Sequence, residues 1–392
     1  MASSIPNFSN SEIAFKHLSD KQLKFSIRMF QLINSPFLSK LGMKLANFGV
    51  KAHLPVSGMI KATLFRQFCG GESMNECDQV IVQLGKNNIG AILDYAIEGA
   101  DKDKVFDHVT DELIRVIRKA EKNPNIPVSC MKLTGVGRFE LFRKLTEKEE
   151  LKEIEKLEFG KVVQRVQRIC QAAHDAQVPI YIDAEESWIQ DAIDRLAESM
   201  MRQFNKEQAI VFTTLQMYRW DKLDHLKKLL KEAQKEQFIV GVKFVRGAYL
   251  EKENNRAQEN GYKSPIQPNK ESTDKDFNAA LELAVKQLKH IEFCAGTHNQ
   301  ESCEILTQLM NEAKLPNDHS HIFFSQLYGM SDNLSYNLSN AGYKVSKYLP
   351  YGPVKATVPY LTRRAEENTS ISGQMSNELS LLMRELKRRK GK

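Results

Sequence analysis

The stretch VPIYIDAEESWIQDAIDRLAESMMRQFNKEQAIVFTTLQMY, residues 178–218, contains the alternation that decides the fold. It begins with a short apolar run at residues 178–186, continues with an amphipathic segment at residues 188–204 and returns to apolar residues at 209–218. Continuously apolar runs are typical of strands that are buried on both faces of a parallel sheet. Apolar residues at helical spacing indicate an amphipathic helix. The stretch therefore predicts a strand, a helix and a second strand in succession.

The same alternation continues on both sides of this stretch. Short apolar runs lie at residues 90–98, 127–135, 178–186, 209–218, 238–249, 291–299, 321–330 and 343–352. Amphipathic, charged segments separate these runs, and eight strand–helix units in sequence predict an α/β protein with a (β/α)8 TIM-like barrel. An open, doubly wound sheet is the alternative, but no glycine-rich G-x-G-x-x-G turn follows any of the runs.

The residues before and after the predicted barrel have different patterns. Residues 11–85 are expected to be helical, because apolar residues recur there at helical spacing behind a Ser–x–Glu start. The end of the chain, ELSLLMRELKRRKGK, is expected to form a helix that finishes in a basic cluster. We therefore expect an N-terminal helical arm at residues 1–85, the barrel at 86–375 and a basic C-terminal tail at 376–392.

The composition is that of a globular protein that works in a reducing compartment. Of the 392 residues, 42% are hydrophobic and 27% are charged, and the net charge of +7 is too mild to indicate a nucleic-acid partner. The six cysteines form no C-x-x-C pair, which argues against a disulfide framework or a zinc site. The N-terminus has no apolar run typical of a secretory signal, so a cytoplasmic protein is expected.

Charged and polar residues collect where the predicted strands end, which is where barrel enzymes bind their substrates. Lys132 and Asp183 are the clearest cases, because each lies in an otherwise apolar run. A charge in such a place is unfavourable unless it is paired or used. A structural ion pair would explain either residue alone, whereas both together at one rim favour a functional role.

Two adjacent arginines follow the last predicted strand. Arg363 and Arg364 lie a few residues beyond a Pro–Gly–Pro-type bend, and Glu367 comes one helical turn later. Neighbours on a helix point about 100° apart, so the two guanidinium groups can reach two sides of one anion. A surface ion pair with Glu367 is the alternative. Their position after the last strand favours a clamp for a carboxylate or a phosphate.

The remaining motifs are weaker signals. His298 stands beside a predicted strand end, where a histidine is more often a hydrogen-bonded structural residue than a catalyst. No second histidine stands at metal-ligand spacing, so no metal is expected. The sequence also has no convincing Ser–His–Asp or nucleophilic-cysteine arrangement.

Four motifs together resemble the proline dehydrogenases. They are YIDAEES, VKFVRGAYL, GTHNQES and YLPYGPVKATVPYLTRRAEENTS, and the resemblance covers all eight runs, from Asp94 to Asn368. FCGGES at residues 68–73 is similar to the segment that precedes the barrel in this family. The resemblance implies a distorted (β/α)8 barrel that binds FAD and oxidises L-proline to Δ1-pyrroline-5-carboxylate, with a quinone as the electron acceptor.

The resemblance also implies roles for individual residues. Lys132, Arg363 and Arg364 would hold the proline carboxylate, Asp183 would steady these cations, and Tyr249, Leu327 and Tyr348 would enclose the ring. Glu98 matches a carboxylate that pairs with Arg363 when the site closes, and Glu367 would hold the arginines. The segments expected to contact FAD contain Gln216, Tyr218, Lys243, Arg246, Gly247, Ala248, Thr273, Thr297, His298, Asn299 and Gln326.

One position departs from the better-known bifunctional bacterial members of the family. Those proteins have an arginine where this chain has Lys243, and that arginine helps to hold the flavin near its reactive N5 atom. Lysine keeps the positive charge but loses the planar fork of donors. Lys243 therefore cannot hold the flavin N5 through the planar fork that the arginine supplies.

Three other functions compete with proline oxidation. A hydroxyproline dehydrogenase has the same fold, but the bulk and hydroxyl of Tyr348 occupy the space that a 4-hydroxyl group needs. A barrel aldolase would use Lys132 or Lys243 as a Schiff-base amine. A non-enzymatic scaffold would explain the N-terminal helices and the tail, but not the two arginines.

The resemblance has consequences for partners and location. The chain contains no aldehyde dehydrogenase module, so a separate pyrroline-5-carboxylate dehydrogenase is expected to act next. Residues 37–54 and the basic cluster at 387–392 are candidates for peripheral contact with a membrane that contains the quinone. The expected location is the cytoplasm, with peripheral binding to the inner face of a bacterial membrane. The alternative is the matrix side of the mitochondrial inner membrane.

Overall fold

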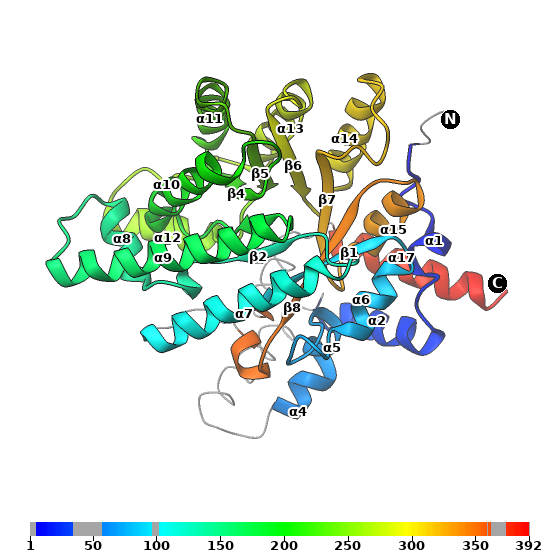
Figure 1. Ribbon diagram of the computed structural model, residues 1–392. Coiled ribbons are helices and arrows are strands. Elements are labelled where there is room, and N and C mark those ends of the chain that lie inside the picture. The colour runs from blue at the N-terminus through cyan, green and yellow to red at the C-terminus, as the bar shows by residue number, and fades with distance from the viewer. Residues whose placement is uncertain (1–4, 34–56, 96–101, 359, 362–373, 392) are drawn as a thin grey trace. The chain divides into compact units, whose positions relative to one another are not determined.

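The computed structural model describes residues 5–33, 57–95, 102–358, 360–361 and 374–391 (Figure 1). The strands are β1 (Ile89–Tyr95), β2 (Ser129–Met131), β3 (Ile180–Ile182), β4 (Val211–Gln216), β5 (Val240–Val245), β6 (Ile291–Gly296), β7 (Ile322–Leu327) and β8 (Val345–Tyr351). Their order in the sheet is β1-β8-β7-β6-β5-β4-β3-β2, and the register pairs are parallel. The eight predicted runs thus became eight parallel strands, and the predicted (β/α)8 barrel is confirmed.

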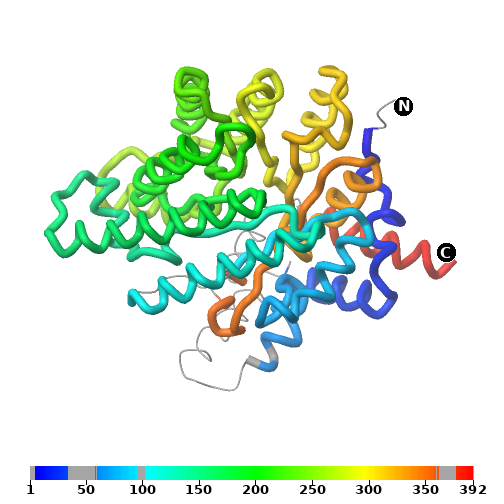
Figure 2. Tube along the Cα trace, in the orientation of Figure 1, coloured from blue at the N-terminus to red at the C-terminus, as the bar shows by residue number. Residues whose placement is uncertain are grey.

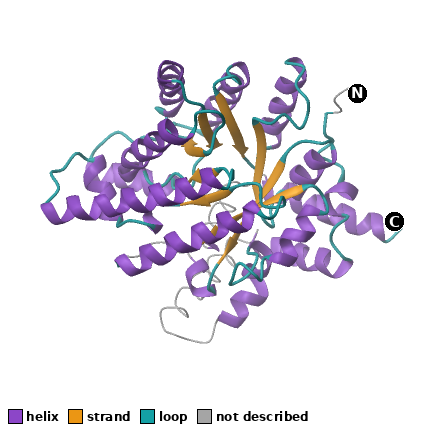
Figure 3. Ribbon diagram, in the orientation of Figure 1, coloured by secondary structure: helices purple, strands orange, loops and turns teal. Residues whose placement is uncertain are grey.

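Helices precede the first strand and alternate with the others, as Figure 3 shows. Those before β1 are α1 (Ser11–Phe15), α2 (Asp20–Ile33), α4 (Ser57–Ile60), the π-helix η1 (Lys61–Phe65), α5 (Arg66–Phe68) and α6 (Asp78–Gly85). Those after β1 are α7 (Asp103–Glu121), the 3-10 helix η2 (Leu133–Gly135), α8 (Phe139–Thr146), α9 (Glu153–Asp175), α10 (Ser187–Phe204), α11 (Lys222–Glu236), α12 (Leu250–Asn260), α13 (Lys270–Lys286), α14 (Gln300–Glu312), α15 (Asp332–Asn340) and α17 (Gln374–Arg389).

The chain divides into two compact units. One consists of Ile97–Thr297 and Ile305–Phe323, and the other consists of Met1–Ala96, His298–Glu304 and Phe324–Lys392. We call the first the β2–β6 unit and the second the terminal unit, because the second contains both ends of the chain together with β1, most of β7 and β8. Each unit is described separately below.

The β2–β6 unit is built on strands whose residues are buried on both faces. Every residue of β4 is buried, and in β5 only Val245 is partly exposed. Helices α10, α11 and α13 cover β4, β5 and β6 (Figure 1). Their apolar positions recur at helical spacing, so one side of each helix packs on the sheet while the charged side faces solvent. The polar segment after β5 forms α12 and the beginning of α13.

In the terminal unit, β8 lies between β7 and β1. The segment FCGGES lies against the end of β8, where the Gly70 N–H donates a hydrogen bond of 2.8 Å to the Pro350 carbonyl. A Cβ atom at Gly71 would lie 2.4 Å from the Glu76 side chain. This position therefore requires glycine, because a side chain would collide with Glu76 of the same segment.

The two ends of the chain lie side by side in the terminal unit, as Figure 2 shows. Leu381 and Leu382 of α17 are buried in one hydrophobic cluster with residues of α1 and α2. Arg389 of α17 donates hydrogen bonds of 2.7 Å to the Phe15 and Leu18 carbonyls. The leucines of the tail are therefore packed inside the protein. No helix among the described residues is both long and apolar enough to cross a membrane.

The helical nature of the N-terminal region is confirmed for its described residues. The domain boundaries at residues 85/86 and 375/376 stay a prediction, although the helices at both ends pack in the same unit as β1 and β8. The segment at residues 37–54, which we considered for membrane contact, lies outside the described residues.

Candidate active site

A buried cluster of one carboxylate and two ammonium groups lies at the carboxyl ends of strands in the β2–β6 unit. Asp183 follows β3 directly, and its N–H donates a hydrogen bond of 2.8 Å to the Met131 carbonyl, which extends the parallel ladder to this residue. One carboxylate oxygen lies 2.5 Å from Lys243 Nζ and the other lies 3.5 Å from Lys132 Nζ. Asp183 therefore joins β2, β3 and β5 through their side chains.

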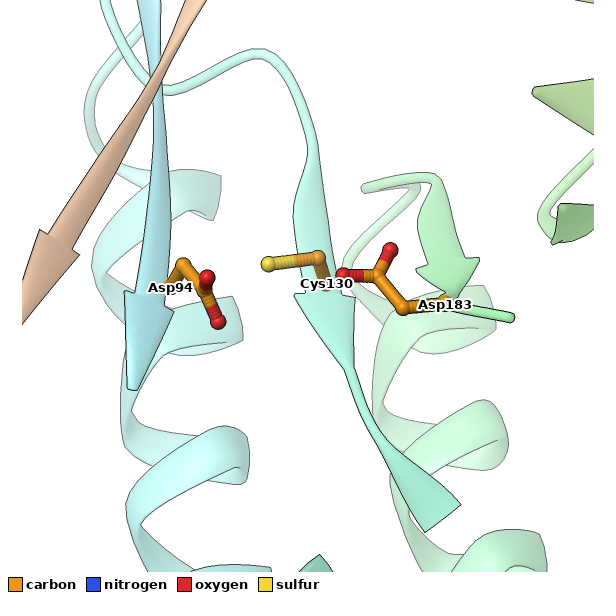
Figure 4. Close-up of side chains that lie close together, drawn as sticks. All are labelled: Asp94, Cys130 and Asp183. Carbon is orange, nitrogen blue, oxygen red and sulfur yellow. The ribbon is translucent and has the colours of Figure 1, made fainter. Parts of the chain in front are cut away.

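The surroundings of this cluster strengthen its electrostatics. Lys243 Nζ lies 5.7 Å from the centre of the Tyr181 ring, and the side chain of Lys243 is only 6% exposed. Figure 4 shows Cys130 of β2 beside Asp183, with the Sγ atom within 4.8 Å of a carboxylate oxygen. In such a weakly polar environment each charge needs its partner. A carboxylate that two ammonium groups neutralise is also a poor ligand for a metal cation.

A second carboxylate, Glu185, connects the loops that follow β2, β3 and β4. Thr134 donates two hydrogen bonds to it, one from its hydroxyl and one of 3.1 Å from its backbone N–H. The Glu185 carbonyl accepts a hydrogen bond of 2.8 Å from Gln216 Nε2. Burial raises the pKa of Glu185 to about 7, with a further contribution from Glu186, while the Thr134 hydrogen bonds and Lys132 act in the opposite direction.

The raised pKa of Glu185 predicts a dependence of stability on pH. In the unfolded chain this carboxyl loses its proton near its ordinary value of 4.5, whereas in the folded protein it does so at about 7. The folded state therefore binds more protons in this interval, so Glu185 lowers the free energy of unfolding as the pH rises through it. We expect Glu185→Gln to raise Tm relative to the native protein at pH 8, and to do so less at pH 5.

Thermal unfolding followed by circular dichroism at pH 5, 6, 7 and 8 measures this difference. Glu155→Gln is the matched control, because the buried Glu155 forms an ion pair of 2.7 Å with Lys144, and this hydrogen bond lowers the pKa of Glu155. Its neutralisation removes an attraction and should not stabilise the protein at pH 8. A Tm difference for Glu185→Gln that stays constant from pH 5 to pH 8 would contradict the raised pKa.

A guanidinium group is fixed at the ends of β5 and β6. Arg246 Nε lies 2.7 Å from an Asp274 carboxylate oxygen, and its NH1 donates a hydrogen bond of 2.6 Å to the Thr297 hydroxyl. The guanidinium carbon lies 4.4 Å from the centre of the Phe277 ring. These contacts hold the plane of the guanidinium, and its partial exposure of 21% leaves the group accessible.

The loop after β5 is shaped by a glycine and a tyrosine. Gly247 has a φ of +135°, and a Cβ atom there would lie 2.5 Å from the Tyr218 ring. Only glycine fits this position. Of the other residues predicted in this region, Ala248 is partly exposed, and Tyr249 is buried where α12 begins. Thr273 is buried on α13, and its hydroxyl donates to the Asn269 carbonyl at 3.3 Å.

In the terminal unit, Leu327 of β7 and Tyr348 of β8 are register partners. Tyr348 is buried and Leu327 is partly buried. His298 lies beside them, and its Nε2 accepts a hydrogen bond of 3.4 Å from the Leu327 N–H. Three residues that were predicted separately, two for the substrate and one for the cofactor, are therefore neighbours at the end of β7.

Two other predicted residues of this unit have structural contacts. The Asn299 side-chain oxygen accepts a hydrogen bond of 2.9 Å from the Ser302 N–H, so it caps α14. Gln326 accepts a hydrogen bond of 2.8 Å from the Ser335 hydroxyl of α15. Lys347 of β8 is fully buried and forms an ion pair of 2.8 Å with Asp332 of α15. Arg363, Arg364, Glu367 and Glu98 lie outside the described residues.

Four residues of these networks were missed in the sequence. Two of them, Glu185 and Asp274, are described above. The other two are Ser331, which precedes α15, and Glu378 of α17, whose carboxylate accepts a hydrogen bond of 2.9 Å from the Ser331 N–H. Glu185 could have been found, because it follows the same apolar run as Asp183 by two residues. Glu378 also had a signal, because it precedes Leu381 and Leu382 by three and four residues and so lies on the apolar side of the terminal helix. Asp274 and Ser331 lie in polar segments and had no comparable signal.

Comparisons with known proteins identify the family of this chain. The proline dehydrogenase family model matches residues 77–377. The chain is 34% identical to mitochondrial proline dehydrogenase 1 of Dictyostelium discoideum, over 95% of this chain and 73% of that protein. It is 35% identical to the carbapenem antibiotics biosynthesis protein CarD of Pectobacterium carotovorum, over 82% of this chain and 83% of that protein.

A solved structure supports the fold. Proline utilization A from Bdellovibrio bacteriovorus, inactivated by N-propargylglycine, superposes with a TM-score of 0.73 over 95% of this chain, at 19% identity. This chain covers 39% of the length of that larger protein. The match of the family model over most of the barrel, together with the identity to a curated relative, shows that this chain belongs to the proline dehydrogenase family, whose members are oxidoreductases acting on proline.

Proposed function

We propose that this chain oxidises L-proline to Δ1-pyrroline-5-carboxylate, with FAD as its cofactor and a quinone as the final electron acceptor. The observation that carries the proposal is the cluster of Asp183, which follows β3, with Lys132, which follows β2, and with the buried Lys243 of β5. Function in a barrel of this type is found at that end. The family membership supplies the reaction class.

The residues of the β2–β6 unit fit an anionic dinucleotide cofactor. Arg246 has a fixed and accessible guanidinium, which suits a pyrophosphate. Lys243, held by Asp183, supplies a second positive charge. When bound, FAD supplies the acceptor for the hydride that proline loses.

The substrate roles divide between recognition of the carboxylate and enclosure of the ring. Lys132 is oriented by Asp183 and, with Arg363 and Arg364, would bind the proline carboxylate. Tyr348, Leu327 and Tyr249 would enclose the apolar ring and exclude water.

The aldolase alternative is disfavoured by the same cluster. A Schiff base needs an amine that is free to attack a carbonyl carbon. Lys132 and Lys243 both face the Asp183 carboxylate, and Lys243 lies 2.5 Å from it. The geometry therefore supports an electrostatic role for both lysines.

The pairing of Tyr348 with Leu327 predicts how the enzyme discriminates between proline and hydroxyproline. We expect Tyr348→Ser to weaken proline oxidation and to improve the relative oxidation of trans-4-hydroxyproline, because serine leaves room for the 4-hydroxyl group. A change of this kind is worth about 1–3 kcal/mol of discrimination. The ratio of kcat/KM for the two substrates measures it, and an unchanged ratio would show that Tyr348 does not face the substrate.

The visible spectrum of the purified protein tests the proposed function directly. We expect flavin absorption bands that bleach when L-proline is added anaerobically and return when a soluble quinone is added. A colourless protein that cannot be reconstituted with FAD would overturn the proposal. Bands that bleach with proline but fail to return with any quinone would overturn the assignment of the electron acceptor.

The quinone acceptor also motivates a proposal about location. We propose that the enzyme contacts a quinone-containing membrane from one side, and that a separate pyrroline-5-carboxylate dehydrogenase consumes the product. The Dictyostelium relative is named as mitochondrial. This name supports the alternative location, on the matrix side of the mitochondrial inner membrane. The leucines of α17 are buried, so membrane contact by the tail would depend on its basic residues.

A further inference from the structure

Both ring nitrogens of His298 have partners in the terminal unit. Nε2 accepts a hydrogen bond from the Leu327 N–H at 3.4 Å, and Nδ1 lies 2.9 Å from the Ser331 hydroxyl oxygen. In a neutral imidazole the accepting nitrogen carries no proton, so Nδ1 carries it and donates to Ser331. The Leu327 N–H can only donate, so it selects the tautomer of His298 that is protonated at Nδ1, and the Ser331 hydroxyl accepts from Nδ1 and holds the orientation of the ring.

Ser331 is itself held in an uncommon conformation. It is the residue before α15, and its φ of +51° lies in the left-handed region, which is unfavourable for residues other than glycine, asparagine and aspartate. Its N–H donates a hydrogen bond of 2.9 Å to one carboxylate oxygen of Glu378, and the Asp332 N–H lies 3.4 Å from the other oxygen. The Glu378 carboxylate therefore binds the first amides of α15 and stabilises the strained residue.

Glu378 reaches this position because α17 packs in the terminal unit. Its side chain is buried, and Leu381 and Leu382 of the same helix face anchor the helix in the hydrophobic cluster. Asp332, the next residue after Ser331, is held in turn by Lys347 at 2.8 Å and His17 at 3.4 Å. The start of α15 is therefore fixed from three sides, by α17, β8 and the N-terminal arm.

We propose that Ser331 and Glu378 are positioning residues that act through His298 on the end of β7. This inference rests on the proposed function, in which His298 contacts FAD and Leu327 contacts proline. Neither Ser331 nor Glu378 touches the substrate in this proposal. They fix the orientation of the His298 ring, and His298 in turn accepts the hydrogen bond from the backbone at Leu327. The terminal helix α17 is then required for a properly formed flavin site as well as for stability.

Three variants test the chain of hydrogen bonds. Ser331→Ala removes the hydroxyl that His298 contacts, and Glu378→Ala removes the carboxylate that holds Ser331. Glu378→Gln keeps one acceptor for the Ser331 N–H, so it should restore part of the native behaviour, and it serves as a second variant if Glu378→Ala does not fold. We expect Ser331→Ala and Glu378→Ala to raise the Kd for FAD about 2- to 12-fold, the effect of one lost hydrogen bond.

Two readouts distinguish positioning from a loss of stability. The visible circular dichroism of bound FAD reports the environment of the flavin, and the ring ¹⁵N chemical shifts of His298 report its tautomer without any need for FAD. We expect both to change in Ser331→Ala and Glu378→Ala, together with a rise in KM for proline that exceeds the fall in kcat. His298→Asn assigns the histidine signals.

Glu385→Gln is the matched control. Glu385 is a buried glutamate on the same helix, but it binds Arg388 and Arg389 at 2.9 and 2.8 Å. Its loss should lower Tm without changing the flavin spectrum or the His298 shifts. If Ser331→Ala keeps the native FAD affinity, flavin dichroism and His298 chemical shifts, this inference is wrong, while the proposed function still stands. A native protein that binds no FAD would overturn the proposed function, and with it the role of His298.

Discussion

Replacing Asp183 by asparagine is expected to lower the free energy of unfolding by about 3–5 kcal/mol, the cost of leaving buried charges without their partner. It is also expected to reduce kcat/KM for proline at least about 100-fold, as a misplaced binding group does. Asp183 lies within 2.5 Å of Lys243 and 3.5 Å of Lys132. Asparagine has nearly the same shape but no charge, so the two ammonium groups would repel each other across it.

The loss of activity is expected to exceed what the loss of stability explains. Lys132 and Lys243 are oriented by the carboxylate, and both would move apart once the negative charge is removed. Lys132 would then no longer point where the substrate carboxylate is expected, and Lys243 would leave its position above Tyr181. Urea unfolding measures the first effect, and steady-state kinetics at a temperature where the variant is fully folded measure the second.

The β2–β6 unit offers a closely matched control for Asp183. Asp194 is also buried, and one of its carboxylate oxygens lies 2.7 Å from the buried Nζ of Lys222, which begins α11. Asp194→Asn should therefore also lower the free energy of unfolding, but it should leave the KM for proline and the FAD content unchanged. Equal losses of kcat/KM in both variants would show that Asp183 acts only through stability.

The strands could be predicted because each is a local signal. β4 is buried along its whole length, and it lies within the run AIVFTTLQMY at residues 209–218, which is mostly apolar and has no charged residue. Such runs do not predict which side chains from different strands come into contact at the site. Lys243 lies in the middle of the fifth apolar run, and only the order of the strands brings it to Asp183 at the end of the third. Convergence of this kind is a long-range property of the fold.

The two ends of the chain show a different limit of the sequence. The terminal helix was expected from its apolar spacing, and it is present as α17. What the sequence did not indicate is that its apolar side packs on α1 and α2, more than 340 residues earlier in the chain. A helix with an apolar side predicts burial but not the partner, so a membrane surface and the N-terminal arm were equally consistent with the pattern.

His298 shows how a correct position can have an unexpected use. Its place beside a strand end was read as either structural or flavin-contacting, and the structure gives it partners on both ring nitrogens. The sequence contains no sign of this, because Ser331 and Glu378 lie in segments far from the GTHN motif. The hydrogen bonds form only once α15 and α17 are folded against the end of β7.

Replacing Arg246 by methionine is expected to raise the Kd for FAD about 10- to 150-fold, because a charge-assisted hydrogen bond contributes about 1.5–3 kcal/mol. Methionine keeps the length of the side chain and its packing on Phe277, but it removes the fork that Asp274 and Thr297 orient. The Kd of Arg246→Lys for FAD should lie between those of the native protein and Arg246→Met, since lysine keeps the charge and loses the planar geometry. Titration of the apoprotein with FAD, followed by flavin fluorescence, measures the three affinities.

Arg202→Met is the matched control for this prediction, because Arg202 has the same kinds of neighbours at a different place. Its guanidinium lies 2.8 Å from carboxylate oxygens of both Glu232 and Glu236, and its central carbon lies 5.4 Å from the centre of the Phe238 ring. It belongs to α10, far along the chain from the loop after β5, and its loss should leave the FAD affinity unchanged. If Arg246→Met binds FAD as tightly as Arg202→Met, the contacts of Arg246 with Asp274 and Thr297 stabilise only the fold. Other residues would then have to bind the pyrophosphate of the cofactor.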